Sequence, residues 1–152
     1  MIKVFGIGNI LLCDDAIGVK VLEKLLPSIK MLSPHIDGII GEMDYLYCLD
    51  CIDTSDFVII IDSTYLNITP GTVSYIPFSD CECFITHSQS SHEITLLKTL
   101  RLEYPYIDGC LIGIEIDKID FSLELSPVLQ NHFESICKEI LEFLKKVVKT
   151  YA

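Results

Sequence analysis

The 152-residue chain has the length of one ordinary domain, and half of its residues are hydrophobic, so a single domain over residues 1–152 can bury a core. Its formal charge of −11 repels phosphate backbones and anionic lipids, which excludes nucleic acid and membrane surfaces as expected partners. Its apolar residues occur in short runs, well below the roughly eighteen residues that a membrane-spanning helix needs.

Hydrophobic periodicity predicts strands that alternate with helices. The run DFVIIID (56–62) is apolar almost throughout, as a strand covered on both faces requires. This alternation predicts an α/β fold, a three-layer α/β/α sandwich with a mostly parallel, twisted central sheet of about five strands. The expected elements, in chain order, are strand 2–7, helix 15–26 with a loop after Pro27, strand 36–42, helix 44–51, strand 56–62, strand 72–78, helix 94–104, strand 109–116 and a last helix beginning at Ser126-Pro127.

The first strand ends in a glycine turn, Gly6 to Leu11, which is followed by two acids, Asp14 and Asp15. Leucine stands where a dinucleotide-binding turn has its third glycine, and carboxylates are unfavourable neighbours for a pyrophosphate. A dinucleotide site is therefore disfavoured. One acid at a helix start is explained by capping, but capping does not explain both. We expect Asp14 to serve the helix end and Asp15 to serve a site.

Asp62 ends the most apolar strand, where an unpaired buried carboxylate is costly. Sites in parallel sheets form at the carboxyl ends of the strands, so its position favours a functional role over capping of the turn that follows. His92 lies in the segment SSHE (90–93), which matches a capping box. In the first turn of a helix the dipole favours a neutral imidazole, which is a good metal ligand; the alternative is an exposed loop histidine, and His87 is a competing candidate.

Asp15, Asp62 and His92 belong to three separate strand–helix units and can meet at one edge of a parallel sheet. Two carboxylates and an imidazole suit a divalent cation such as Ni²⁺ or Zn²⁺. A rival zinc site would use Cys48-x-x-Cys51 with Cys81-x-Cys83. The seven cysteines lack the spacing of a secreted disulfide scaffold, and the chain opens directly on a strand pattern, so we expect reduced thiols without an assigned role, no signal peptide and a cytoplasmic protein.

The segment GIGNILLCDDAIGVKVLE (6–23) resembles the amino-terminal signature of the nickel–iron ([NiFe]) hydrogenase maturation endopeptidases. Later features are similar too, and the resemblance covers nearly the whole chain. The residues that carry it are Gly6, Gly8, Asn9, Leu11, Asp14, Asp15 and Gly18 in the signature, then Asp62, Pro70-Gly71, His92 and Leu125-Ser126-Pro127.

The resemblance implies an endopeptidase that removes the carboxy-terminal extension of a hydrogenase large-subunit precursor after nickel insertion. Asp15, Asp62 and His92 would contact a nickel ion that belongs to the substrate, with Asp62 and Asp15 catalytic and Asp62 as the base. No permanent metal or organic cofactor is implied, and we expect a monomer. The alternative from another class is a non-cleaving nickel-binding chaperone or checkpoint protein for hydrogenase assembly.

Specificity is where the chain departs from the family pattern. Many members have a glycine-glycine or glycine-threonine segment after the second strand, in a region linked to substrate recognition. This chain has Gly41 followed by Glu42. We expect these two residues and Asn9 to bind the substrate, and the departure bears on which substrate is recognised more than on the reaction.

Overall fold

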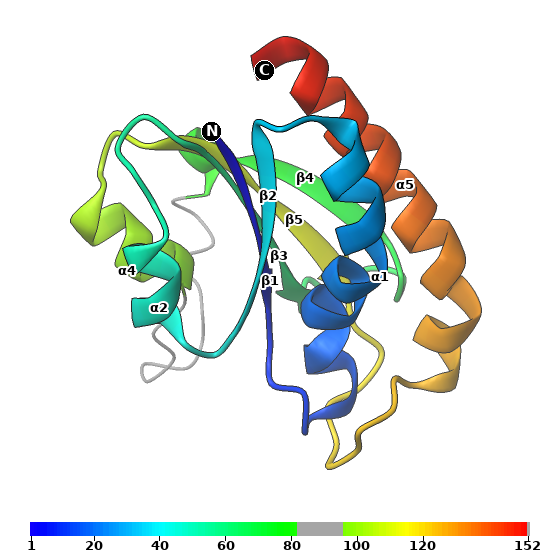
Figure 1. Cartoon of the computed structure of the whole chain (residues 1–152). Coiled ribbons are helices and arrows are strands. Elements are labelled where there is room, and N and C mark those ends of the chain that lie inside the picture. Colours follow the sequence, from blue (N-terminus) through cyan, green and yellow to red (C-terminus); the bar gives the residue numbers. More distant parts are fainter. Residues whose placement is uncertain (82–95, 152) are drawn as a thin grey trace.

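The structure is a computed structural model that describes residues 1–81 and 96–151, and Figure 1 shows the whole chain. The expected helix start at Ser90, together with His87, His92 and Cys83, lies outside the described residues. The elements are β1 (Ile2–Ile7), the short 3-10 helix η1 (Cys13–Ala16), α1 (Ile17–Leu32), β2 (Ile36–Glu42), α2 (Tyr45–Asp50), β3 (Phe57–Thr64), β4 (Val73–Pro77), the 3-10 helix η2 (Phe78–Asp80), α4 (Leu96–Glu103), β5 (Asp108–Glu115) and α5 (Pro127–Tyr151).

The five strands form one sheet in the order β2-β1-β3-β5-β4. The pairs β1–β2, β1–β3 and β3–β5 are parallel, and only β4, at one edge, runs antiparallel to β5. Helices α1 and α5 cover one face of this sheet, and α2 and α4 cover the other (Figure 1). The expected three-layer α/β/α sandwich with a mostly parallel sheet is confirmed.

Burial on both faces explains why β3 is so apolar. Ile59 and Ile61 pack into the core cluster that includes residues of α1 and α5, whereas Val58 and Ile60 pack into the cluster on the side of α2 and α4. Successive side chains of a strand point to opposite faces, so a central strand between two helical layers needs apolar residues at every position. Phe57–Thr64 also extends two residues beyond the expected end at Asp62.

The first long helix differs from the sequence prediction. It begins at Ile17, after η1, and continues through Pro27 to Leu32, whereas a loop was expected after Pro27. A proline inside a helix removes one hydrogen bond and crowds the preceding turn. Ile29, fully buried in the core beyond the proline, supplies the packing that keeps the last turns helical.

The last helix begins as predicted. It starts at Pro127, and the Ser126 hydroxyl oxygen accepts a hydrogen bond from the Leu129 amide at 3.4 Å, as expected of an N-cap. Among the described residues, no helix is both long enough and apolar enough to cross a bilayer.

Candidate active site at the carboxyl ends of the parallel strands

Two glycines let the chain turn back on the sheet directly after β1. Gly8 has a φ of 139°, and a Cβ at this position would lie 1.9 Å from the Asp15 carbonyl oxygen. Gly18 lies equally close to β3, since a Cβ there would lie 2.2 Å from the carbonyl oxygen of Ile61. Only glycine permits these approaches, which bring η1 and the first turn of α1 against the ends of β1 and β3.

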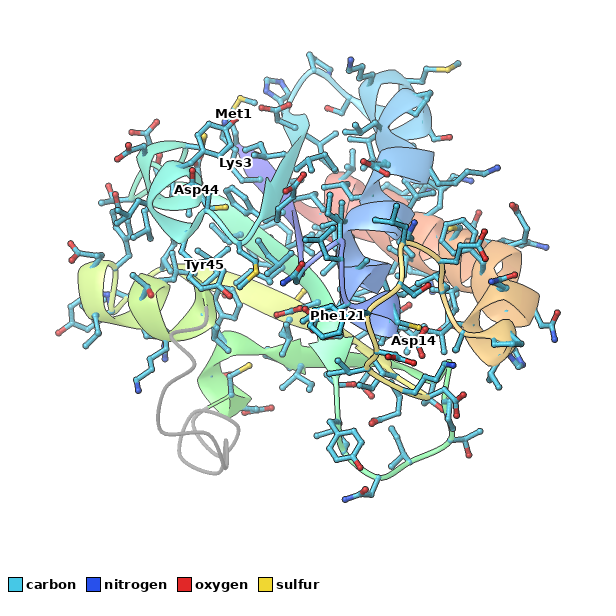
Figure 2. The ribbon with its side chains drawn as sticks, turned by 90° about the horizontal axis from the view of Figure 1, so that it is seen from below. Met1, Lys3, Asp14, Asp44, Tyr45 and Phe121 are labelled. Carbon is cyan, nitrogen blue, oxygen red and sulfur yellow. The ribbon has the colours of Figure 1, made fainter. Side chains whose placement is uncertain are left out.

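Asp15 is held by two hydrogen bonds at this end of the sheet, which Figure 2 views from below. Its Oδ2 accepts the backbone amide of Asn9 at 2.8 Å, and its Oδ1 accepts the hydroxyl of Ser63 at 2.9 Å. The amide of Ser63 donates in turn to Oδ1 of Asp62, at 2.8 Å. Ser63 therefore joins two carboxylates that come from separate strand–helix units, and both are half-buried.

This arrangement suits acid–base chemistry and cation binding. Half-buried carboxylates that are oriented by N–H and O–H donors keep a fixed geometry while remaining in reach of a ligand. His92, the expected third member, lies outside the described residues. Within residues 1–81 and 96–151, no group of three or more His, Cys, Asp or Glu side chains could hold a metal ion. The expected set of Asp15, Asp62 and His92 stays a prediction.

The prediction that Asp14 serves the end of its own helix is wrong. Asp14 instead holds the loop between β5 and α5. Its carboxylate is fully buried, and a buried carboxylate needs hydrogen-bond donors. The loop supplies three backbone amides, from Asp117 and Lys118 at 3.0 Å each and from Ser126 at 2.7 Å. Asp14 therefore fixes both the loop and the start of α5.

The three residues expected to bind substrate lie at the ends of β1 and β2: Asn9 follows β1, whereas Gly41 and Glu42 are the last two residues of β2. The side-chain oxygen of Asn9 accepts the Leu11 amide at 3.0 Å, which stabilises the turn while the Asn9 amide orients Asp15. Gly41 is buried, and a Cβ there would lie 2.4 Å from Cys48 Sγ, so packing of α2 against β2 already requires a glycine.

Glu42 is exposed at the end of β2 and has a φ of 48°. Its carbonyl oxygen accepts the Gly8 amide at 3.0 Å, which ties the ends of β1 and β2 together. A left-handed backbone favours glycine, so this glutamate stands where glycine would be less strained. A substrate role for Asn9, Gly41 and Glu42 stays a prediction.

Ser63 and Glu115 were not among the residues predicted from the sequence to serve the site. Glu115 ends β5 and is only 1% exposed, and both of its carboxylate oxygens accept the Leu66 amide, at 2.6 and 2.9 Å. This contact fixes the loop that follows Asp62 and Ser63. The signal was present, because an acid ending an apolar strand is the pattern that identified Asp62.

The cysteines of the rival zinc site have the following surroundings. Cys48 is buried, and burial, with a further contribution from Cys51 and Asp44, raises its pKa to about 12. Its thiol is therefore protonated at neutral pH, whereas zinc binds the thiolate. Cys51 is half-buried and Cys81 is buried, while Cys83 lies outside the described residues.

Comparison with known proteins shows the family to which the chain is similar. The family model described as hydrogenase maturation protease matches residues 36–143. The Hydrogenase 2 maturation protease of Escherichia coli (strain K12) is 27% identical over 151 residues, covering 95% of this chain and 91% of that protein. Hydrogenase expression/formation protein HupD of Thiocapsa roseopersicina is 25% identical over 150 residues, covering 94% of this chain and 67% of that protein.

The fold is shared with a solved structure. The hydrogenase maturating endopeptidase HybD from E. coli has a TM-score of 0.78 at 22% identity, covering 96% of this chain and 93% of that chain. This likeness confirms the architecture, and the family match, which spans more than half of the chain, confirms the resemblance seen in the sequence. The chain therefore belongs to the hydrogenase maturation protease family and is a hydrolase.

Proposed function

We propose that this protein is a monomeric cytoplasmic endopeptidase that removes the carboxy-terminal extension of a [NiFe]-hydrogenase large-subunit precursor once nickel has been inserted. The observation that carries the proposal is the link through Ser63, which holds Asp15 and Asp62 at one end of the sheet. Membership of the hydrogenase maturation protease family supports the reaction class. Two carboxylates from separate strand–helix units supply the groups that peptide hydrolysis needs.

The reaction is the hydrolysis of one peptide bond, with Asp62 as the base. Asp62 takes a proton from a water molecule while the oxygen of that water forms a bond to the scissile carbonyl carbon. The tetrahedral intermediate collapses as the C–N bond breaks, and the proton on Asp62 passes to the leaving amine. The carboxylate is thereby regenerated. The Ser63 amide, 2.8 Å from Asp62 Oδ1, fixes the orientation of the base.

Nickel enters this scheme as part of the substrate. Asp15, Asp62 and His92 offer two carboxylates and an imidazole, which suit a divalent cation of this kind. A nickel ion contacted there would polarise the scissile carbonyl and activate the water. Asp15, oriented by the Ser63 hydroxyl and the Asn9 amide, would then favour precursors that carry the metal.

The test is the intact mass of a hydrogenase large-subunit precursor, prepared with and without nickel, after incubation with the protein. We expect a carboxy-terminal peptide to be lost only from the nickel-loaded precursor. Loss from both forms would retain the peptidase and remove the metal recognition. Tight binding without any loss of mass would replace the proposal with the chaperone function.

Four variants sharpen this test. Asp62→Asn should abolish cleavage, whereas Asp50→Asn, which removes an exposed carboxylate at the end of α2, should leave it unchanged. His92→Ala should weaken nickel-dependent cleavage more than His87→Ala does. The reverse order would transfer the metal contact to His87.

A further inference from the structure

Exposed apolar side chains gather in the loops at the carboxyl ends of the strands. Surface apolar residues scattered singly are normal, whereas a contiguous group marks an interaction site. The described loops that follow β1, β2, β3 and β5 contribute Ile10, Leu11, Met43, Tyr65, Ile68, Ile119, Phe121 and Leu123 to the exposed large apolar residues.

The loop between β5 and α5 presents three of these side chains at alternate positions, Ile119, Phe121 and Leu123. A parallel bridge joins Leu12 to Ser122, through hydrogen bonds from the Ser122 amide to the Leu11 carbonyl and from the Cys13 amide to the Ser122 carbonyl. Leu11 and Phe121 each stand one residue before this bridge, and the Leu11 carbonyl itself accepts the amide that follows Phe121. We call Leu11, Ile119, Phe121 and Leu123 the apolar rim.

The apolar rim is fixed in place by buried groups. The Asp14 carboxylate binds three amides of the loop, including those at both of its ends. Phe121 nevertheless remains 89% exposed, so its ring contributes little to the folded core. Figure 2 shows Phe121 and Asp14 near each other at this end of the molecule. A loop that is ordered before binding loses less conformational entropy when a partner docks on it.

The negative charge around the apolar rim indicates which kind of partner can bind it. The loop carries Asp117, Asp120 and Glu124 against a single cation, Lys118, and the whole chain has a formal charge of −11. Acidic residues around an apolar centre match a partner with basic residues around apolar ones. They disfavour a second copy of this equally acidic chain.

We propose that the apolar rim is the docking surface for the hydrogenase precursor, and that it receives a segment in which apolar side chains are flanked by lysine or arginine. This proposal rests on the proposed function. The rim adjoins the candidate site, because Leu11 lies between Asn9 and Asp15 on the same turn. An aromatic anchor at the centre of an apolar surface is typical of a binding hot spot. The acidic residues would steer the basic segment toward it.

The test compares Phe121→Ala with Tyr106→Ala. Tyr106 is an aromatic residue that is 98% exposed and precedes β5, at the opposite end of the sheet. We expect Phe121→Ala to raise KM for precursor cleavage by about tenfold or more with kcat unchanged, and Tyr106→Ala to change neither. Unaltered thermal unfolding of both variants would exclude misfolding as the cause. If the variant that carries both Phe121→Ala and Leu123→Ala has an unchanged KM, the proposal is overturned.

Direct binding separates this proposal from the proposed function. Affinity of the precursor is measured for the Asp62→Asn protein with and without Phe121→Ala. If the wild-type protein cuts no precursor but Phe121→Ala still lowers this affinity, the reaction is wrong and the docking surface stands. If cleavage occurs and the affinity does not change, the docking surface is wrong and the reaction stands. If the wild-type protein forms dimers and Phe121→Ala dissociates them, the rim binds a second copy of this chain and the proposal is overturned.

Discussion

The hydroxyl of Ser63 donates a 2.9 Å hydrogen bond to Asp15, a residue 48 positions away in the chain. The same serine donates its amide to Asp62. Ser63 is thus the point at which the two acidic members of the proposed site are held relative to each other.

Removal of this hydroxyl should impair activity more than stability. We expect Ser63→Ala to lower kcat/KM for precursor cleavage by roughly 10- to 100-fold, as loss of a group that orients a ligand does. The free energy of unfolding should fall by about 1 kcal/mol or less. Ser63→Thr retains the hydroxyl and should recover activity, while Ser55→Ala, at an exposed serine, is the control. Full activity of Ser63→Ala would remove Ser63 from the site.

Asp14 and Asp15 are adjacent acids with different duties. Asp14→Asn should lower the free energy of unfolding by roughly 3 kcal/mol, because a fully buried carboxylate that binds three amides loses part of this set. Asp15→Asn should change stability little and abolish cleavage. Urea unfolding and the cleavage assay together check this split. Equal losses of stability in the two variants would contradict it.

Glu42 combines backbone strain with a charge, and two substitutions separate them. Glu42→Gly should raise the free energy of unfolding by roughly 0.5–1 kcal/mol, since glycine adopts the left-handed conformation without the Cβ penalty. Glu42→Gln keeps the strain and removes the charge. If the Glu42 carboxylate contacts the substrate, both variants should change kcat/KM for a given precursor by a similar factor. A change in Glu42→Gly alone would assign the effect to the backbone.

The buried thiols should make the protein less stable in alkali. Burial raises the pKa of Cys110 to about 12, with Cys81 and Asp108 adding to the shift, whereas an unfolded thiol ionises near pH 8.5. The stabilisation is fully present below about pH 8.5. It is lost as the pH rises toward 12, because only the unfolded state releases the proton in this window.

Urea midpoints at a series of pH values from neutral to alkaline check this dependence. Cys110→Val removes one ionising group and should flatten the alkaline decline. An identical decline in Cys110→Val and in the wild-type protein would contradict the assignment to Cys110.

The sequence by itself determined the layers of the fold and brought Asp15 and Asp62 to the same end of the sheet, where Ser63 links them. The period of the apolar residues distinguishes strands from helices, and parallel strands bring their carboxyl ends to one edge. Asp15 and Asp62 follow from that rule alone, because each stands where a strand–helix unit turns over the edge of the sheet. The signature around Gly8 also indicated the family.

Only the tertiary structure decided which groups the polar side chains contact. Asp14 binds amides that are 103 to 112 residues away, and no local pattern contains such partners. Pro27 stays inside α1 because Ile29 is buried beyond it, and β4 runs antiparallel because it pairs with β5 at the sheet edge. Hydrogen bonds and packing between distant segments set these outcomes, whereas periodicity reports only the face that a residue occupies.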